Sequence, residues 1–204
     1  MNNTSPLAQQ FVLATTAFFA GLTGIGIAQL ASGPGIACHL HAPADTLFPL
    51  AIAVLVALRF CSGATTSWMR YYTSPDSGPK RQIGSLLFLI SYGLMLVMAG
   101  NAATWSAFLE WLGWLSLLAT VAAILRLKWP YPGGEKRTSF AWGITNGVCA
   151  WIFLSVGSDE SLAGSLAFSL LALAVTVWAF VVDLRYQLNM ARDSNIPPPT
   201  RETI

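Results

Sequence analysis

Charge is the scarcest property of this sequence. Charged side chains make up 10% of its 204 residues, whereas about 25% is usual in soluble domains. Hydrophobic residues make up 54%, the mean hydropathy is +0.58, and there are eight tryptophans. Such a composition is expected in a lipid bilayer rather than in water. We therefore predict an integral membrane protein, with the bilayer as its first partner.

Histidine is also nearly absent, since His39 and His41 are the only two and share one loop. Without histidine in the hydrophobic segments, a helix bundle lacks the common haem ligand. No lysine lies in those segments to form a Schiff base with a carbonyl cofactor. Acidic and basic residues are too sparse to place a catalytic pair at one depth. The sequence therefore argues against an enzyme, and we expect no cofactor.

Basic residues and cysteines are few and scattered. The 11 Lys and Arg exceed the 9 Asp and Glu by only two, and they are spread through short segments. No basic patch is dense enough to bind nucleic acid. Cys38, Cys61 and Cys149 are predicted in an outer loop, at an inner helix end and near the bilayer centre, so no pair should form a disulfide.

The loop at residues 32–45 holds the one weak metal-site candidate. Cys38, His39, His41 and Asp45 are ligand types used by transition metals. However, the adjacent Cys38 and His39 are awkward ligands for one ion, and no second Cys/His cluster exists in the sequence. An ordinary outer loop explains the segment equally well, so no metal is assigned.

Six long hydrophobic segments define the fold class. About 20 apolar residues span a bilayer as a helix, and residues 1–10 carry no Lys or Arg, so the first segment is expected to be a retained helix rather than a signal peptide. We predict an all-α integral membrane protein, a bundle of six transmembrane helices forming one domain at 1–187, followed by a disordered cytosolic tail at 188–204. The predicted spans are 11–31, 47–69, 83–103, 111–127, 139–157 and 161–183.

The distribution of basic residues orients this bundle. With six spans and both termini in the cytosol, every Lys and Arg falls on or near the inner side: Arg59, Arg70, Lys80, Arg81, Arg126, Lys128, Lys136, Arg137, Arg185, Arg192 and Arg201. The outer side instead collects Asp45, Glu110, Asp159 and Glu160. Short loops obey the positive-inside rule closely. We therefore predict a cytoplasmic (inner) membrane protein, of bacterial type, with basic loops and tail facing the cytosol.

Arg59 is the residue around which the second segment is organised. It lies 12 residues past Leu47, or roughly 18 Å along a straight helix. A charge at the bilayer centre costs about 2.5 to 3.5 kcal/mol on insertion scales. The favoured interpretation is an anchor that extends to the inner lipid surface, as the Leu-Arg endings at Arg126 and Arg185 also suggest. The alternative is a buried arginine paired with a carboxylate, for which Asp183 is nearest in depth.

Other polar and small residues within the spans mark contacts or a pathway. Asn101, Thr145, Asn146 and Asp183 either form helix–helix hydrogen bonds or, together with Arg59, line a polar path. Small residues at spacings of four favour close helix crossing: Ala20, Gly24 and Ala28 in the first segment, and Gly143 and Gly147 in the fifth.

Two functional hypotheses follow. A transporter or channel subunit for a small neutral or cationic solute should bring those five polar residues to one cavity with an acidic outer mouth. A non-transporting auxiliary, sensory or assembly subunit should instead have a dry interior. It would bind a membrane partner, or a second copy of itself, through a Gly/Ala face. The sequence favours the first hypothesis and identifies neither solute nor partner.

Overall fold

The computed structural model describes residues 6–32, 48, 50–62, 79–128, 136–159 and 166–194. Within these ranges the chain forms six helices and no strands. Five are α1 (Pro6–Ser32), α4 (Pro79–Gly100), α5 (Trp105–Lys128), α6 (Lys136–Gly157) and α8 (Leu166–Ser194), and the sixth occupies Leu50–Ser62. The all-α prediction is confirmed for this part of the chain.

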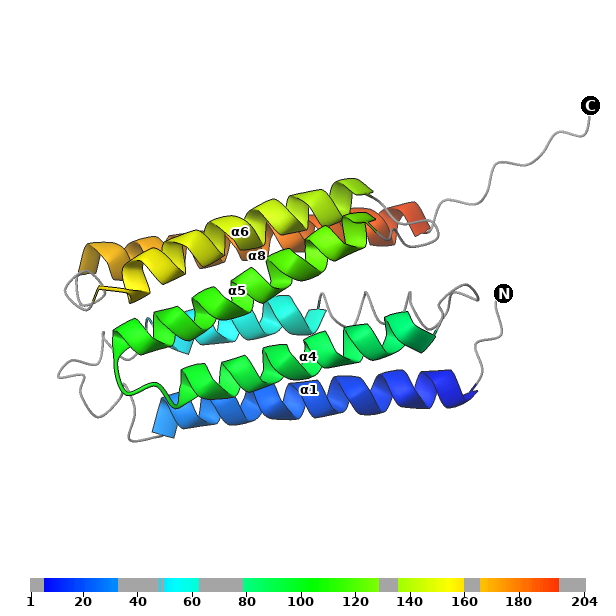
Figure 1. Ribbon diagram of the computed structural model, residues 1–204, viewed down its shortest axis with the longest axis horizontal. Coiled ribbons are helices and arrows are strands. Elements are labelled where there is room, and N and C mark those ends of the chain that lie inside the picture. The colour runs from blue at the N-terminus through cyan, green and yellow to red at the C-terminus, as the bar shows by residue number, and fades with distance from the viewer. Residues whose placement is uncertain are drawn as a thin grey trace, which may run out of the picture.

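The helices run alternately up and down along one long axis (Figure 1). The start of α1 and the end of α8 lie at the same end of the bundle. The closest packing joins α5 to α6 and α1 to α4, while α4 also packs on α5 and α6 on α8. The α4–α5, α5–α6 and α6–α8 contacts follow from short connections, which favour antiparallel neighbours. In contrast, α1 and α4 are not consecutive in the chain and run in the same direction.

Three helices are long and apolar enough to cross a membrane: Trp105–Leu127, Ser139–Gly157 and Leu166–Arg185. The apolar parts of the other three are shorter: Leu13–Gln29, Leu50–Ser62 and Leu86–Gly100. At 1.5 Å per residue, the 13 residues of Leu50–Ser62 cover about 20 Å, less than a hydrocarbon core of about 30 Å. By length and composition, the described residues therefore contain three helices able to span a membrane and three shorter apolar helices.

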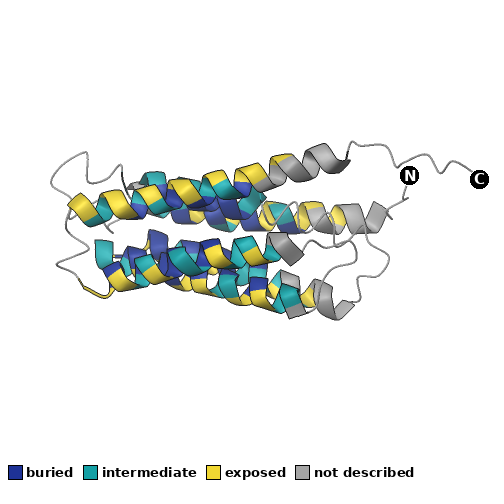
Figure 2. Ribbon diagram, turned by 90° about the horizontal axis from the view of Figure 1, so that it is seen from above, coloured by how far each residue is buried: buried dark blue, intermediate teal, exposed yellow. Residues whose placement is uncertain are grey.

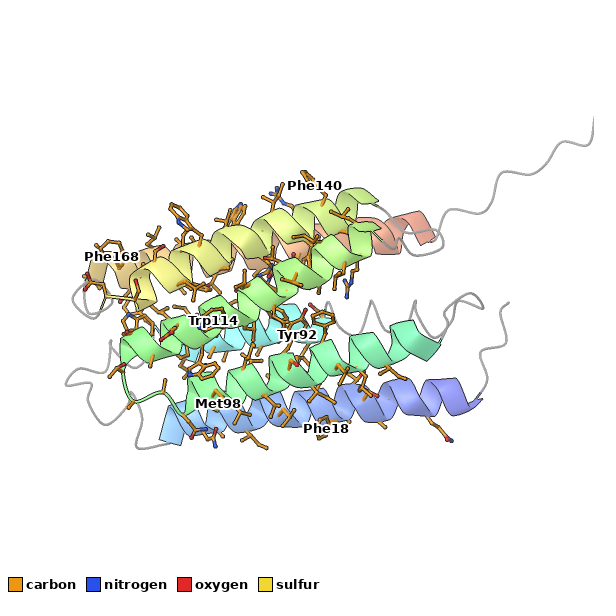
Figure 3. All side chains as sticks on the ribbon, viewed as in Figure 1. Phe18, Tyr92, Met98, Trp114, Phe140 and Phe168 are labelled. Atoms are coloured by element: carbon orange, nitrogen blue, oxygen red, sulfur yellow. The ribbon has the colours of Figure 1, made fainter. Side chains whose placement is uncertain are left out.

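Burial follows the inner faces of the helices, and the outer faces carry exposed apolar side chains (Figure 2). Leu50–Ser62 is the most enclosed helix, with Ile52, Val56 and Phe60 at most 3% exposed. On the outside, Phe18 of α1 and Phe140 of α6 point away from the bundle, whereas Tyr92 of α4 points into it (Figure 3). An apolar exterior around a packed interior suits a bilayer.

The contact between α1 and α4 depends on two glycines that face each other. A Cβ atom on Gly26 would lie 2.6 Å from the carbonyl oxygen of Leu96, and one on Gly100 would overlap the carbonyl oxygen of Gly26. Because both obstacles are backbone atoms, neither can move aside. Backbone-to-backbone approach of this kind is what small residues permit in membrane helices.

The predicted small-residue face of α1 lies elsewhere. Ala20, Gly24 and Ala28 are exposed, and a Cβ on Gly24 would meet nothing within 4 Å. The inward side of α1 instead carries Phe19 and Thr23 together with Gly26. The expected packing role is therefore wrong within this chain, because spacing alone does not distinguish an inward from an outward face.

Two helix boundaries also differ from the sequence prediction. The predicted outer link at 104–110 is mostly helix, because the hydroxyl of Thr104 accepts a hydrogen bond of 3.1 Å from the backbone N–H of Ala107 and starts α5 one residue later. At the other end, α8 continues to Ser194, into the segment predicted to be disordered. Residues 188–194 contain good helix formers, and the first proline comes at 197. Residues 195–204 lie outside the described ranges.

Candidate functional site

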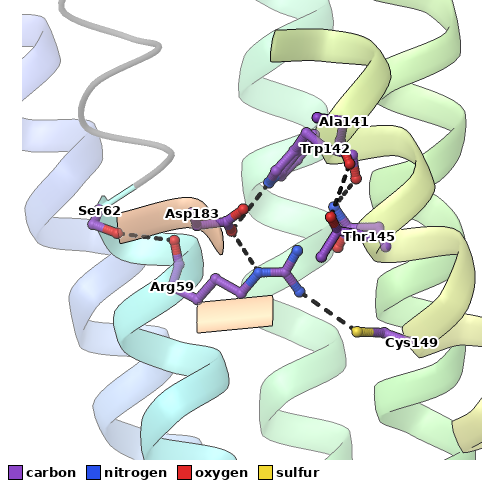
Figure 4. Close-up of polar contacts among 8 residues, drawn as sticks. Arg59, Ser62, Ala141, Trp142, Thr145, Cys149 and Asp183 are labelled. Atoms are coloured by element: carbon purple, nitrogen blue, oxygen red, sulfur yellow. Dashed lines mark hydrogen bonds and ion pairs between the residues drawn. The ribbon is translucent and has the colours of Figure 1, made fainter. Parts of the chain in front are cut away.

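Arg59 and Asp183 form an ion pair inside the bundle. The distance from Arg59 Nε to Asp183 Oδ2 is 2.5 Å, and the two residues are 3% and 7% exposed. Arg59 comes from Leu50–Ser62 and Asp183 from α8, so the pair joins helices that are far apart in the sequence (Figure 4). Burying either charge alone would cost several kcal/mol, and the opposite charge offsets much of that cost.

The local sequence explains why Asp183 faces inward. Ala172, Thr176 and Ala179 lie eleven, seven and four residues before Asp183, a spacing that keeps all four on one helix face, and all are buried. These side chains are small, so α8 can lie close to its neighbours. This close approach places the carboxylate of Asp183, the last residue of this face, beside the guanidinium of Arg59.

Trp142 of α6 fixes the carboxylate from a second side. Its indole Nε1 donates a hydrogen bond of 3.3 Å to the same Asp183 oxygen that Arg59 contacts. The Trp142 ring also lies beneath the guanidinium carbon of Arg126 at 5.2 Å and meets the ring of Phe60 edge-on at 6.3 Å. Phe60 in turn packs edge-on against Tyr92 of α4 at 5.0 Å. The pair and its aromatic support thus involve five of the six helices.

Cys149 marks how far the arginine side chain reaches into α6. Arg59 Nη1 lies 3.9 Å from Cys149 Sγ, the range of a weak sulfur hydrogen bond. Cys149 is ten residues from Ser139, the start of the apolar part of α6, or about 15 Å along the helix. The guanidinium therefore turns into the bundle between Asp183 and Cys149 (Figure 4). The geometry supports the pairing interpretation of Arg59, and the residue does not act as an anchor at the lipid surface.

Asn146 lies on the same face of α6, one turn after Trp142 and one turn before Cys149. It is fully buried, and its Nδ2 donates to the carbonyl oxygen of Trp142 at 2.8 Å. Within the polar residues of the three helices that meet at the pair, two buried atoms make no hydrogen bond to the described residues: the Arg59 Nη2 donor and the Asn146 Oδ1 acceptor. The buried hydroxyl of Tyr92, which packs on Phe60, makes none either. We call Arg59, Trp142, Asn146, Cys149 and Asp183 the polar cluster.

The remaining predicted site residues lie outside the polar cluster. Thr145 is buried, and its hydroxyl donates back to the carbonyl oxygen of Ala141 at 2.8 Å. Asn101 is exposed beyond the end of α4, where its Nδ2 donates to Gln29 Oε1 at 2.8 Å. Asn101 therefore ties α1 to α4 at the opposite end of the bundle. Two of the five polar candidates, Arg59 and Asp183, contact each other, and Asn146 lies on the α6 face between the two residues that contact them.

The metal-site candidates Cys38, His39, His41 and Asp45 lie outside the described residues. Among the residues that are described, no group of three or more His, Cys, Asp or Glu could hold a metal ion.

A small pocket of about 10 Å³ lies between α1, α4, α5 and the Leu50–Ser62 helix, away from the polar cluster. This volume suits one water molecule at most. Its lining is almost entirely apolar and includes Gly26, Ala53, Leu96 and Phe108, with the Thr23 hydroxyl as its polar side chain. A pocket of this size and lining does not form a solute path.

Sequence reasoning missed Trp142 and the contact made by Cys149. The three cluster residues of α6 are spaced by four and then three residues, the pattern of a single helix face. The spacing predicts that the three residues share one face of α6, but nothing in the sequence indicates that this face is turned toward Arg59. Comparisons of the chain with protein families, characterised proteins and solved structures find no match.

Proposed function

We propose that the protein is a small multi-pass protein of the bacterial inner membrane, acting as a transporter or channel subunit for a small neutral or cationic solute. The observation that carries this proposal is the buried Arg59–Asp183 pair with unpartnered polar atoms beside it. Ionisable residues inside membrane helices are rare, and they commonly mark solute or ion pathways. The pair is close to electroneutral, which suits a solute that carries little charge of its own.

The proposal includes six spans with both termini in the cytosol. Its support is the placement of charge along the helices. The start of α4, the end of α5, the start of α6 and the end of α8 lie at one end of the bundle (Figure 1) and carry Lys80, Arg81, Arg126, Lys128, Lys136, Arg137, Arg185 and Arg192. Glu110 and Asp159 lie toward the opposite end. This asymmetry follows the positive-inside rule.

In this proposal the structure represents a closed state. Asp183 Oδ2 accepts from both Arg59 and Trp142, so the carboxylate holds α8 against two other helices. A passing solute would have to compete with these contacts. Opening would then separate α8 from the Leu50–Ser62 helix at the polar cluster.

The test is flux through liposomes containing the purified protein, with glycerol and urea as neutral solutes and methylammonium as a cation. Arg59→Ala weakens the closed state, but it also removes the donor that would bind the solute in the open state. It should therefore lower the flux of the transported solute by about tenfold, the change expected from about 1.4 kcal/mol of lost interaction. Arg185→Ala, the same substitution at an exposed position of α8, serves as the matched control and should leave flux unchanged. Equal flux in wild type and Arg59→Ala, or no flux above protein-free liposomes for any of these solutes, would overturn the proposal.

A second candidate is a non-transporting subunit that binds a membrane partner or a second copy of itself. The outward Gly/Ala face of α1 supports it, because a Cβ on Gly21 or Gly24 would meet nothing within 4 Å. Gly24→Leu should then release the partner or dissociate the oligomer, as measured by light scattering of the purified complex. Leu170→Ala on the exposed side of α8 is the control. An unchanged mass for Gly24→Leu, or a monomeric wild type without a partner, would reject this candidate.

A further inference from the structure

We infer that the polar cluster holds one small neutral molecule through a protonated oxygen atom, either water or the hydroxyl group of a solute, between Arg59 Nη2 and Asn146 Oδ1. Both atoms are buried and make no hydrogen bond to the described residues. Arg59 is 3% exposed and Asn146 is fully buried. Leaving a buried donor or acceptor unsatisfied costs about 1 to 3 kcal/mol, so two such atoms in one region point to a bound partner.

The helical geometry brings the two groups together. Arg59 contacts α6 through Cys149, and the carboxylate of its own partner Asp183 contacts α6 through Trp142. Asn146 lies between these two positions on the same helix face. Figure 4 shows the guanidinium between Asp183 and Cys149, with its uncontacted nitrogen directed toward the turn of α6 that carries Thr145. Asn146 is the next residue in the same turn.

The chemistry of the two atoms selects the bound group. Arg59 Nη2 can only donate, and Asn146 Oδ1 can only accept. A ligand that satisfies both must accept one hydrogen bond and donate another, as a water molecule or an alcohol does. The guanidinium disfavours a cation, while Asp183, already within 2.5 Å of Arg59 Nε, disfavours an anion. A neutral molecule is the remaining choice.

The pocket beside Thr23 provides the contrast. Thr23 is the one polar side chain in its apolar lining, so a water molecule there would find few hydrogen-bond partners. A buried water usually makes about three hydrogen bonds. In the polar cluster a guanidinium donor and an amide acceptor are both fixed in place. The polar cluster is therefore the better binding site of the two.

This inference deepens the proposed function, and it rests on that proposal only for the step in which the bound molecule crosses the membrane. It names the recognised group as a hydroxyl and so favours small alcohols and polyols over amines. Water would occupy the same position when no solute is present.

X-ray radiolytic labelling tests the site, because hydroxyl radicals formed from a bound water oxidise the side chains beside it. In detergent-solubilised wild type, Trp142 should be oxidised faster than Trp151, although Trp151 is 72% exposed on the outer side of the same helix. Asn146→Leu, which removes the acceptor, should lower labelling of Trp142 and Cys149 by roughly threefold, in keeping with loss of one of the bound water's two anchors. Trp151 labelling should stay constant.

Added glycerol separates the two sources of the oxygen atom. Because glycerol also scavenges hydroxyl radicals in solution, the ratio of Trp142 to Trp151 labelling is compared. A lower ratio with glycerol would assign the site to hydroxyl solutes, and an unchanged ratio would assign it to water. Slower labelling of Trp142 than of Trp151 in wild type would overturn the inference without relying on any variant. Equal Trp142 labelling in wild type and a folded Asn146→Leu would also overturn it. If labelling behaves as expected but no solute crosses liposomes, the proposed transport fails while the binding site stands.

Discussion

Arg59 and Asp183 are separated by 124 positions in the chain, and their side chains meet at 2.5 Å inside the helix bundle. The pair links an enclosed helix, Leu50–Ser62, to α8. Only 22% of the apolar, membrane-spanning part of α8 is buried inside the protein. The pair therefore adds a polar link to the packing that the buried face of α8, with Ala172, Thr176 and Ala179, makes against the rest of the chain.

Removing one charge of the pair should destabilise the protein more than removing both. Asp183→Leu leaves a buried arginine without its counter-charge and should cost about 3 to 5 kcal/mol of unfolding free energy. Combining it with Arg59→Met should recover most of this loss, because two apolar side chains of similar volume replace the pair. Unfolding by SDS in mixed micelles, followed by circular dichroism, measures the unfolding free energy of both variants.

Glu110→Gln is the exposed control, expected to change the unfolding free energy by less than about 0.5 kcal/mol. A double variant no more stable than Asp183→Leu would contradict this account.

Trp142 contributes to the polar cluster in two separable ways. Trp142→Phe keeps an aromatic ring beneath Arg126 and beside Phe60 but deletes the donor to Asp183, and it should cost about 1 to 2 kcal/mol. Trp142→Leu also removes the ring and should cost about 3 kcal/mol. The same SDS titration measures both variants. Equal stability of wild type and Trp142→Phe would show that the indole N–H contributes nothing, and equal stability of the two variants would show the same of the ring.

The glycine contact between α1 and α4 gives a matched pair of variants. Gly100→Ala places a methyl group against the backbone of Gly26 and should destabilise by about 1 to 3 kcal/mol. Gly24→Ala, two residues from Gly26 but on the open side of α1, should be neutral or stabilise slightly, because alanine favours helix. Thermal unfolding in detergent compares the two. Gly24→Ala as damaging as Gly100→Ala would show that the crossing does not depend on Gly100.

The six-span topology predicts which ends of the helices react from outside the cell. In a cysteine-free background, Ser158→Cys at the end of α6 should react with an impermeant maleimide on intact cells, and Arg185→Cys near the end of α8 should react only after the membrane is opened. Both side chains are exposed in the structure, so accessibility within the protein does not distinguish them. The reverse order of labelling would refute the proposed orientation.

The helices themselves were predictable because long apolar runs have few alternatives to helix in a bilayer. Their ends were less so: the start of α5 depends on a single hydroxyl, that of Thr104, in a link that otherwise resembles a loop. The glycine contacts show a similar limit. Gly143 and Gly147 form a G-x-x-x-G, yet Cβ atoms there would lie 3.3 and 3.8 Å from α5, with room for small adjustment. Gly26 and Gly100, which do touch, belong to different helices, so no spacing rule within one helix could pair them.

The candidate site was predictable in its charges and not in its surroundings. Matching depth along two helices suggested Asp183 as a partner for Arg59, but only as the alternative to an anchor at the lipid surface, which the Leu-Arg endings favoured. Trp142 and Cys149 carry no charge, and their part in the site depends on the rotation of α6 about its own axis. That rotation is set by packing against α5, where Gly113 lies under Leu154 and Gly157 lies against the backbone of Glu110. Such contacts arise only after the helices have assembled.

The backbone contact between Gly26 and Gly100 also limits which parts of this protein can move. With no side chains between them at that point, α1 and α4 cannot come closer together without atomic overlap. The other side of the bundle is restrained differently, because α8 is held by one carboxylate together with a stripe of small buried side chains. A proton or a competing ligand at that carboxylate would therefore weaken one restraint on α8 and leave its packing in place.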